Sequence, residues 1–117
     1  MHLHELTIHE AHRLLKKREI SSKELTAALL TRIDNLNERL GAYLTITADD
    51  ASAQAEAADR WLASGEAAGP LTGIPVALKD VLCTEGVRTT AGSRILENFV
   101  PPYDAAVVAR LRRAGAV

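Results

Sequence analysis

A long amphipathic helix with a clear signal at each end constrains the fold of this chain more than any other feature. Ser21 and Glu24 form a capping box, in which the serine hydroxyl reaches the backbone N–H three residues on. Gly41 is the residue type that usually ends a helix. Between these signals, apolar residues recur along one helical face: Leu25, Leu29, Ile33, Leu36 and Leu40. A continuous apolar face needs a packing partner, so this segment predicts a folded domain.

Shorter signals of the same kind predict three further helices. Thr7 and Glu10 form another capping box, and the helix that they open ends at the basic run 16–18. We expect Thr47 to cap a third helix and Asp104 to cap a fourth. The faces expected to be buried are Ala51, Ala55, Ala58 and Leu62 in the third helix, and Val107, Val108, Leu111 and Ala114 in the fourth.

Two stretches between the helices are expected to be strands. Residues 42–47 alternate apolar and polar side chains, which predicts a half-buried strand. Residues 76–80 are short and nearly all apolar after Pro75, which suits a strand covered on both faces. Residues 116–117 are expected to begin a parallel neighbour of that strand. This order of predicted helices and strands indicates an α/β fold. Because a strand is expected to begin at the end of the sequence, at Val117, we expect the chain to be the N-terminal piece of a larger protein.

Composition and charge exclude several classes of protein. Lys and Arg number 14 and Asp and Glu 15, so the net charge of −1 argues against a general polyanion-binding domain. One cysteine cannot form an internal disulfide, which excludes a small disulfide-stabilised secreted scaffold. No apolar run approaches the ~20 residues of a membrane span, and no signal peptide is visible. We therefore expect a cytoplasmic protein that does not contact a membrane.

Three other features suggest chemistry but have simpler interpretations. Four histidines lie near the N-terminus, yet the segment His9–His12 is one residue short of the His-Glu-x-x-His pattern of a zinc helix. Cys83 has no base beside it in the sequence, and a lone cysteine after an apolar stretch is more often a small buried hydrophobe. The basic clusters 16–18 and 110–113 end helices, where cations are expected in any case. We assign no metal, nucleophile or RNA contact to them.

Lys79 is different because it directly follows the apolar run 76–78. Lysine is almost never fully buried unless it is paired or catalytic. On a strand, Asp80 should point to the opposite face and would not pair with it. A desolvated, unpaired lysine near a strand end is what a neutral amine base requires. Two alternatives stay open: Lys79 reaches solvent from a shorter strand, or it pairs with an acid outside this chain.

Several segments together resemble a known family. Gly73–Asp80, which reads Gly-Ile-Pro-Val-Ala-Leu-Lys-Asp, resembles the amidase signature family. Cys83–Thr90, Ser93–Ala105 and Ile20–Thr26 resemble in particular the A subunits of glutamyl-tRNA(Gln) amidotransferases within that family. One departure is the pair 91–92, where Ala-Gly stands in place of the cysteine that often follows the two threonines in these subunits. The likeness covers essentially the whole chain.

The resemblance implies an α/β fold with a mixed β-sheet between helical layers, incomplete in this chain. Residues 1–117 would be the N-terminal part of one larger amidase domain, with a helical segment at 1–41 and the start of the sheet region at 42–117. It also implies a Ser–cis-Ser–Lys triad in which Lys79 is the catalytic lysine and Asp80 a supporting residue. Both serines would lie beyond Val117, so we expect this chain alone to be inactive.

The implied function is that of an ammonia-releasing glutaminase subunit. Its ammonia would pass to a B subunit that uses ATP and Mg²⁺ to convert Glu-tRNA(Gln) to Gln-tRNA(Gln), and a C subunit would help to hold the complex together. This chain itself is expected to bind no cofactor. Two alternatives remain: a stand-alone amidase acting on another primary amide, for which the run 89–93 (Thr-Thr-Ala-Gly-Ser) is also typical, and a small helical interaction module that docks through the 25–40 face.

Overall fold

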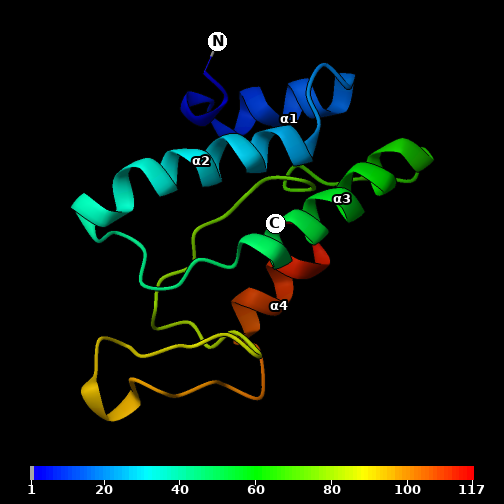
Figure 1. The fold of residues 1–117 in the computed structure, drawn as a ribbon. Coiled ribbons are helices and arrows are strands. Elements are labelled where there is room, and N and C mark those ends of the chain that lie inside the picture. Colours follow the sequence, from blue (N-terminus) through cyan, green and yellow to red (C-terminus); the bar gives the residue numbers. More distant parts are fainter. Residues whose placement is uncertain (1) are drawn as a thin grey trace. The chain divides into compact units, whose positions relative to one another are not determined.

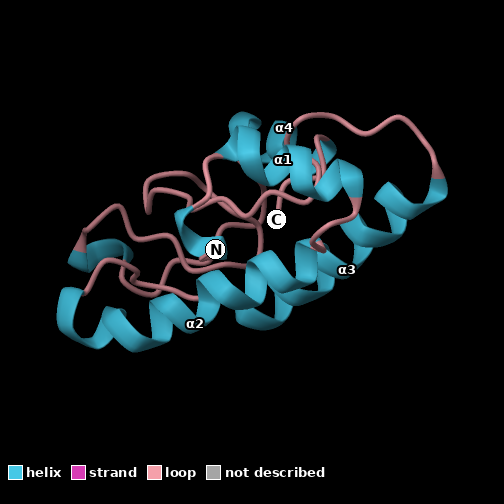
Figure 2. Cartoon of the chain, turned by 90° about the horizontal axis from the view of Figure 1, so that it is seen from above, coloured by secondary structure: helices cyan, strands magenta, loops and turns pink. Residues whose placement is uncertain are grey.

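The computed structural model describes residues 2–117 and is built mainly from helices (Figures 1 and 2). In chain order the elements are η1 (Leu3–Glu5), α1 (Ile8–Lys17), α2 (Ser22–Leu40), α3 (Ala48–Ser64), η2 (Arg94–Leu96) and α4 (Ala106–Arg113). The chain divides into two compact units, one made of residues 2–76 with Ala114–Val117 and the other of Ala77–Arg113. Within residues 2–117, no helix is both long enough and apolar enough to cross a bilayer.

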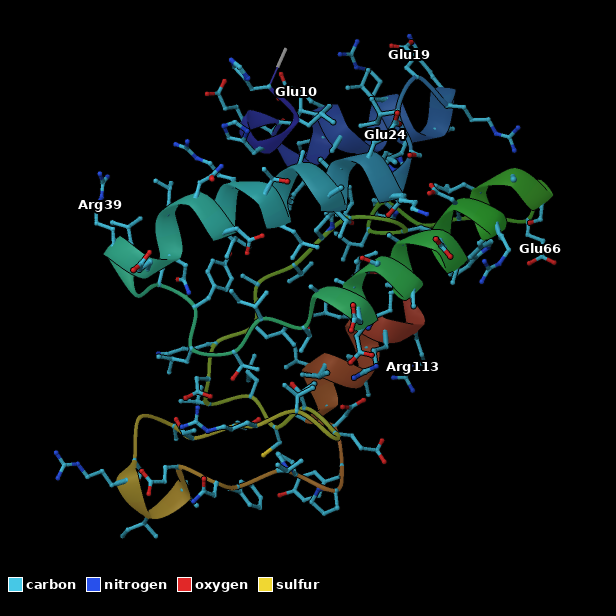
Figure 3. All side chains as sticks on the ribbon, in the orientation of Figure 1. Glu10, Glu19, Glu24, Arg39, Glu66 and Arg113 are labelled. Carbon is cyan, nitrogen blue, oxygen red and sulfur yellow. The ribbon has the colours of Figure 1, made fainter. Side chains whose placement is uncertain are left out.

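Both predicted capping boxes are confirmed. Thr7 Oγ1 accepts a hydrogen bond from the Glu10 N–H at 3.3 Å, and the Glu10 carboxylate accepts one from the Thr7 N–H at 2.8 Å. Ser21 and Glu24 make the same pair of bonds at the start of α2, at 3.1 and 2.8 Å. Figure 3 labels the two glutamates at these helix starts. Gly41 ends α2 in the left-handed conformation, as the sequence predicts.

The core of the first unit lies where α1 and α2 meet the segment around Ile74. Its buried members are Ala11, Leu15, Leu25 and Ile74, with Leu3, Leu6, Ile20 and Leu62 packed against them. Only the first residue of the predicted α2 stripe is fully buried, and the stripe becomes exposed toward Leu40, which is 61% exposed. The small residues Ala55 and Ala58 are buried in α3 as predicted, and α2 and α3 are in contact.

Polar bonds tie the start of α2 to α3 and to the segment that follows α3. The Asp59 carboxylate accepts from the backbone N–H of Ser22 at 2.7 Å and of Lys23 at 3.1 Å. The buried Ser22 hydroxyl donates to the Gly73 carbonyl at 2.8 Å. A Cβ added at Gly73, whose φ is +77°, would lie 3.1 Å from the Ser22 Cβ. Glycine is therefore required at this close approach.

The predicted strand at 42–47 is wrong. Residues 42–47 are irregular and exposed, and Leu44 is 62% exposed. The physical reason is local: the Asn37 side chain accepts from the Tyr43 N–H at 2.8 Å and donates to the Tyr43 carbonyl at 2.9 Å. A side chain that satisfies these backbone groups removes the need for a strand partner. Thr47 does precede α3 as predicted, but its side chain makes no capping bond.

The predicted strand at 76–80 is also not formed over its length. Residues 74–79 have no regular structure, and residues 76–79 are exposed. Its first part does have a backbone partner, because the Val117 N–H donates to the Ile74 carbonyl at 3.0 Å and the Val76 N–H donates to the Val117 carbonyl at 2.8 Å. These two bonds have the pattern of a parallel ladder. The remainder has no neighbouring strand among the described residues, so the covered strand that we expected does not form.

The second unit is mostly irregular chain followed by α4. Residues 86–89 run alongside residues 97–101, where the Gly86 N–H donates to the Pro101 carbonyl and the Thr89 N–H to the Phe99 carbonyl, each at 3.0 Å (Figure 1). The prediction that Asp104 caps α4 is wrong. Its carboxylate instead accepts from the Glu85 N–H at 2.7 Å and pairs with Arg112 at 2.9 Å, so these longer-range bonds use the oxygens that a cap would need.

Candidate active site around Lys79

Lys79 is exposed in this structure, so the burial that its sequence position predicted is wrong for this chain. The neighbouring Val76 and Leu78 are 37% and 39% exposed. A strand is desolvated on both faces only when other elements pack on both faces. Among the described residues nothing covers 76–79 in that way, so the lysine side chain lies in solvent.

The backbone around Lys79 is nevertheless well held. The Lys79 carbonyl accepts from the Leu82 N–H at 3.0 Å, which closes a tight turn. The next carbonyl, that of Asp80, accepts from the Ala91 N–H at 2.8 Å. Two consecutive carbonyls are therefore fixed, one within its own turn and the other to the chain about ten residues on. All of these groups belong to the second unit, Ala77–Arg113.

The Asp80 carboxylate binds the same later segment. It accepts from the Thr90 N–H at 2.9 Å and from the Thr90 hydroxyl. The Thr90 hydroxyl bond, the Thr90 N–H, the Gly92 N–H and the charge of Arg88 together hold the pKa of Asp80 below its usual range. Each of these interactions favours the ionised carboxylate. Asp80 is therefore an acceptor that organises the loop at 90–92.

That loop is a tight turn in an uncommon conformation. The Ser93 N–H donates to the Thr90 carbonyl at 2.9 Å, and the two central residues, Ala91 and Gly92, have φ values of +51° and +68°. Positive φ at both central positions is typical of a type I′ turn. Glycine adopts this conformation freely, whereas a residue with a Cβ is strained in it. The strain at Ala91 is stored directly beside the bonds that hold Asp80.

Cys83, for which no catalytic role is expected from the sequence, lies elsewhere in the second unit. Cys83 is half-buried, and its carbonyl accepts from the Ala105 N–H at 2.7 Å. The Cys83 side chain raises the pKa of Tyr103, mainly through a hydrogen bond and to a lesser extent through the charge of Cys83. Among the residues that the structure describes, no three histidine, cysteine or acidic side chains are grouped as metal ligands would be.

Thr90 belongs to the candidate site, and the sequence patterns did not predict its place there. It is 6% exposed, and its hydroxyl both donates to Asp80 and accepts from the Gly92 N–H at 3.2 Å. A threonine ten residues after an aspartate is not a recognisable local motif. The sequence contains only an indirect signal for this role of Thr90. The Ala-Gly pair that follows it permits a turn with positive φ, and such a turn places Thr90 next to a hydrogen-bond partner.

Comparison with known proteins agrees with the resemblance seen in the sequence. The family model named Amidase matches residues 24–117. The A subunit of the glutamyl-tRNA(Gln) amidotransferase from Geobacter sulfurreducens is 61% identical over 117 residues, which is 100% of this chain and 24% of that protein. The protein of the same name from Granulibacter bethesdensis is 64% identical over 115 residues, covering 98% of this chain and 23% of the relative. The chain thus spans about a quarter of the length of these relatives.

Solved structures show the same relationship at the level of the fold. The native peptide amidase from Stenotrophomonas maltophilia superposes with a TM-score of 0.89 at 39% identity, over 97% of this chain and 23% of its own. A bacterial aryl acylamidase described as an amidase signature enzyme superposes with a TM-score of 0.88 at 24% identity, over 98% and 24%. With the family model matching most of its residues, this chain belongs to the amidase family.

Proposed function

We propose that this chain is part of the A subunit of a glutamyl-tRNA(Gln) amidotransferase, the component that releases ammonia from glutamine. The observation that carries the proposal is the 61% identity to a protein of that name over all 117 residues. The matched region covers all 117 residues, so it spans both structural units and the segment around Lys79. An isolated helical interaction module would not account for a likeness of this extent.

We propose Lys79 as the general base of a Ser–cis-Ser–Lys triad. A neutral amine takes the proton of the nucleophilic serine through the second serine while the serine oxygen attacks the amide carbon of glutamine. The proton then passes to the leaving nitrogen, ammonia departs, and water hydrolyses the acyl-enzyme to glutamate by the same route. The exposed lysine side chain and its fixed backbone support this role, since the amine is free to meet groups that the rest of the protein supplies.

The wider assembly follows from the same proposal. The bonds between 74–76 and Val117 would be the first part of a mixed sheet between helical layers, with 1–41 as the helical segment before it and 42–117 as the start of the sheet region. B and C subunits would complete the enzyme in the cytoplasm. The B subunit would use ATP and Mg²⁺ to activate Glu-tRNA(Gln), while this chain would bind no cofactor and act on glutamine alone.

The base assignment is tested by Lys79→Arg and Lys79→Ala in the full-length, assembled enzyme. Arginine keeps the positive charge but cannot give up a proton near neutral pH. We therefore expect both variants to lose kcat for glutamate release by more than the 10²–10⁴-fold that is typical of one acid–base residue, because members of a triad act as a unit. Binding of glutamine should change much less.

Lys23→Arg and Lys23→Ala serve as matched controls. Lys23 is also exposed, and its amine pairs with Glu56 at the surface of the first unit. Both control variants should retain wild-type turnover. If Lys79→Arg retains most of the wild-type kcat, positive charge is the property that matters and the base assignment is wrong.

A second candidate is a stand-alone amidase that acts on another primary amide. Two observations favour it: the Ala91-Gly92 pair, and the 39% identity to a solved peptide amidase. The two functions differ in where the ammonia goes. Purified enzyme supplied with glutamine, ATP, Glu-tRNA(Gln) and the B and C subunits should form Gln-tRNA(Gln) if the first proposal is right. Hydrolysis of peptide amides without any gain from these partners would favour the second.

A further inference from the structure

We propose that Asp80 and Thr90 form a clamp that positions Lys79 for the reaction, so that both are positioning residues of the glutaminase site. The inference rests on the proposed role of Lys79 as the base. It concerns only groups of the second unit, Ala77–Arg113. The clamp comprises the Asp80 carboxylate and carbonyl on one side and the backbone and hydroxyl of residues 90–92 on the other.

The geometry shows that the clamp holds the peptide which carries Lys79. Both oxygens of the Asp80 carboxylate bind Thr90, one at its N–H (2.9 Å) and one at its hydroxyl. The Asp80 carbonyl binds the Ala91 N–H at 2.8 Å, and the Lys79 carbonyl binds the Leu82 N–H at 3.0 Å. The backbone on the C-terminal side of Lys79 is therefore held directly at two carbonyls, and the Asp80 side chain adds two further bonds. An exposed side chain on so restrained a backbone has a fixed origin from which to reach the second serine of the proposed triad.

The clamp also keeps the Asp80 carboxylate occupied. A free carboxylate beside the lysine would pair with its ammonium form and oppose the neutral base. In the structure the neutral Thr90 and Gly92 donors are the main groups that stabilise this carboxylate, and the charge of Arg88 adds a smaller effect. Because these groups donate hydrogen bonds to the carboxylate, they stabilise its negative charge in the position that it occupies in the structure. Asp80 can thus lie next to Lys79 in the sequence without becoming its counter-ion.

The strained turn indicates that the clamp has a purpose beyond chain reversal. Ala91 is held at a φ of +51°, where a Cβ is unfavourable, while Thr89 and Thr90 are each 6% exposed. Strained backbone persists only where the surroundings determine it, and such positions gather at functional sites. Here the hydrogen bonds between Asp80 and residues Thr90 and Ala91 hold the turn in its strained conformation. The turn and the peptide of Lys79 are consequently fixed to each other.

Loosening the clamp should therefore affect the chemical step more than substrate binding. A displacement of about 1 Å in a catalytic group can cost on the order of 10²-fold in rate. Loosening the clamp would also free the Asp80 carboxylate to pair with the Lys79 ammonium, which favours the protonated form of the lysine. The expected signature has two parts: a lower kcat at nearly constant KM, and an acidic limb of the kcat/KM profile displaced to higher pH.

The test is Thr90→Val in the full-length, assembled enzyme, with Thr89→Val as its matched control. Valine keeps the shape of threonine but removes the hydroxyl. Thr89 has the same burial, and its hydroxyl donates to the Val87 carbonyl at 3.1 Å instead of to Asp80. We expect Thr90→Val to lower kcat about tenfold to a hundredfold and to move the acidic midpoint up by about half a pH unit or more. Thr89→Val should leave the midpoint in place, and Thr90→Ser, which retains the hydroxyl, should restore both values.

Each outcome distinguishes the clamp from the function on which it rests. If Lys79→Ala is inactive but Thr90→Val and Thr89→Val show the same unshifted midpoint, the clamp is overturned and the base assignment stands. Substantial activity in Lys79→Ala overturns the base and the clamp with it. Should Thr90→Val fail to assemble, Thr90→Ala replaces it, because it also removes the hydroxyl bond to Asp80 without changing a charge, and it must still raise the midpoint if the clamp acts as proposed.

Discussion

Replacing Asp59 by alanine should open the start of α2 while leaving the rest of that helix largely intact. Asp59 lies on α3 and accepts hydrogen bonds from the backbone N–H groups of Ser22 and Lys23, in the first turn of α2. These two N–H groups have no partner inside their own helix. Alanine removes both acceptors at once, and the negative charge that favours a helix N-terminus is lost with them.

The size of the effect follows from how exposed each N–H is. Ser22 is 0% exposed, so its N–H would remain buried without a partner, at a cost of about 1–3 kcal/mol. Lys23 is exposed and its N–H can bind water, which leaves only the loss of about 0.3–1 kcal/mol in charge–dipole energy. Together these give a local destabilisation of about 3 kcal/mol. Asparagine at 59 retains one oxygen for the Ser22 N–H and should cost about 1 kcal/mol.

Hydrogen exchange measured by mass spectrometry on the full-length protein reads this effect directly. A loss of about 3 kcal/mol predicts exchange roughly a hundredfold faster in peptides from the start of α2, since each 1.4 kcal/mol corresponds to a factor of ten. Asp50→Ala is the control, because Asp50 lies in the first turn of the same α3 and is exposed. It should leave the α2 peptides unchanged. Exchange within about threefold of wild type in Asp59→Ala would refute the reasoning.

Three further predictions concern the backbone and pH. Gly115→Ala should destabilise the protein by about 1–3 kcal/mol more than Gly65→Ala in thermal unfolding. Both glycines have positive φ, but only at Gly115 would an added Cβ lie 2.8 Å from the Trp61 ring. Equal losses of stability in the two variants would contradict this reasoning. Ala91→Gly should stabilise by about 0.5 kcal/mol in the same assay, since relief of ~1 kcal/mol of strain is partly offset by the greater entropy of the unfolded chain; a net loss would show that no strain is stored there. The folded-state pKa of Asp80 is lowered, so its stabilisation is present above the unfolded value of about 3.9 and is lost as pH falls through the lower folded value. Exchange protection of residues 89–93, corrected for intrinsic rates, should thus be constant from pH 7 to 5 and fall below about pH 4, and Asp80→Asn should abolish that dependence.

Local signals predicted the helices well because the contacts involved are local. The bonds of each capping box join residues three apart, and the left-handed end of α2 depends on Gly41 itself. The buried face of α3 could likewise be read from alanines at helical spacing, since the helix period decides which residues share a face. The likeness of Gly73–Asp80 to the amidase signature was also visible without coordinates. The helix positions and the family could therefore be predicted from the order of residues alone.

The remaining features depend on partners distant in the sequence. Alternation at 42–47 predicted a strand, but a strand needs a neighbour, and Asn37 took the backbone groups of Tyr43 instead. The apolar run before Lys79 predicted burial, but burial is a property of what packs against a segment, and residues 76–79 lie exposed. Asp80 meets Thr90 only because an intervening loop returns beside it. A period or a cap reports the conformation of its own residues, whereas pairing and desolvation depend on which other residues the tertiary structure brings near.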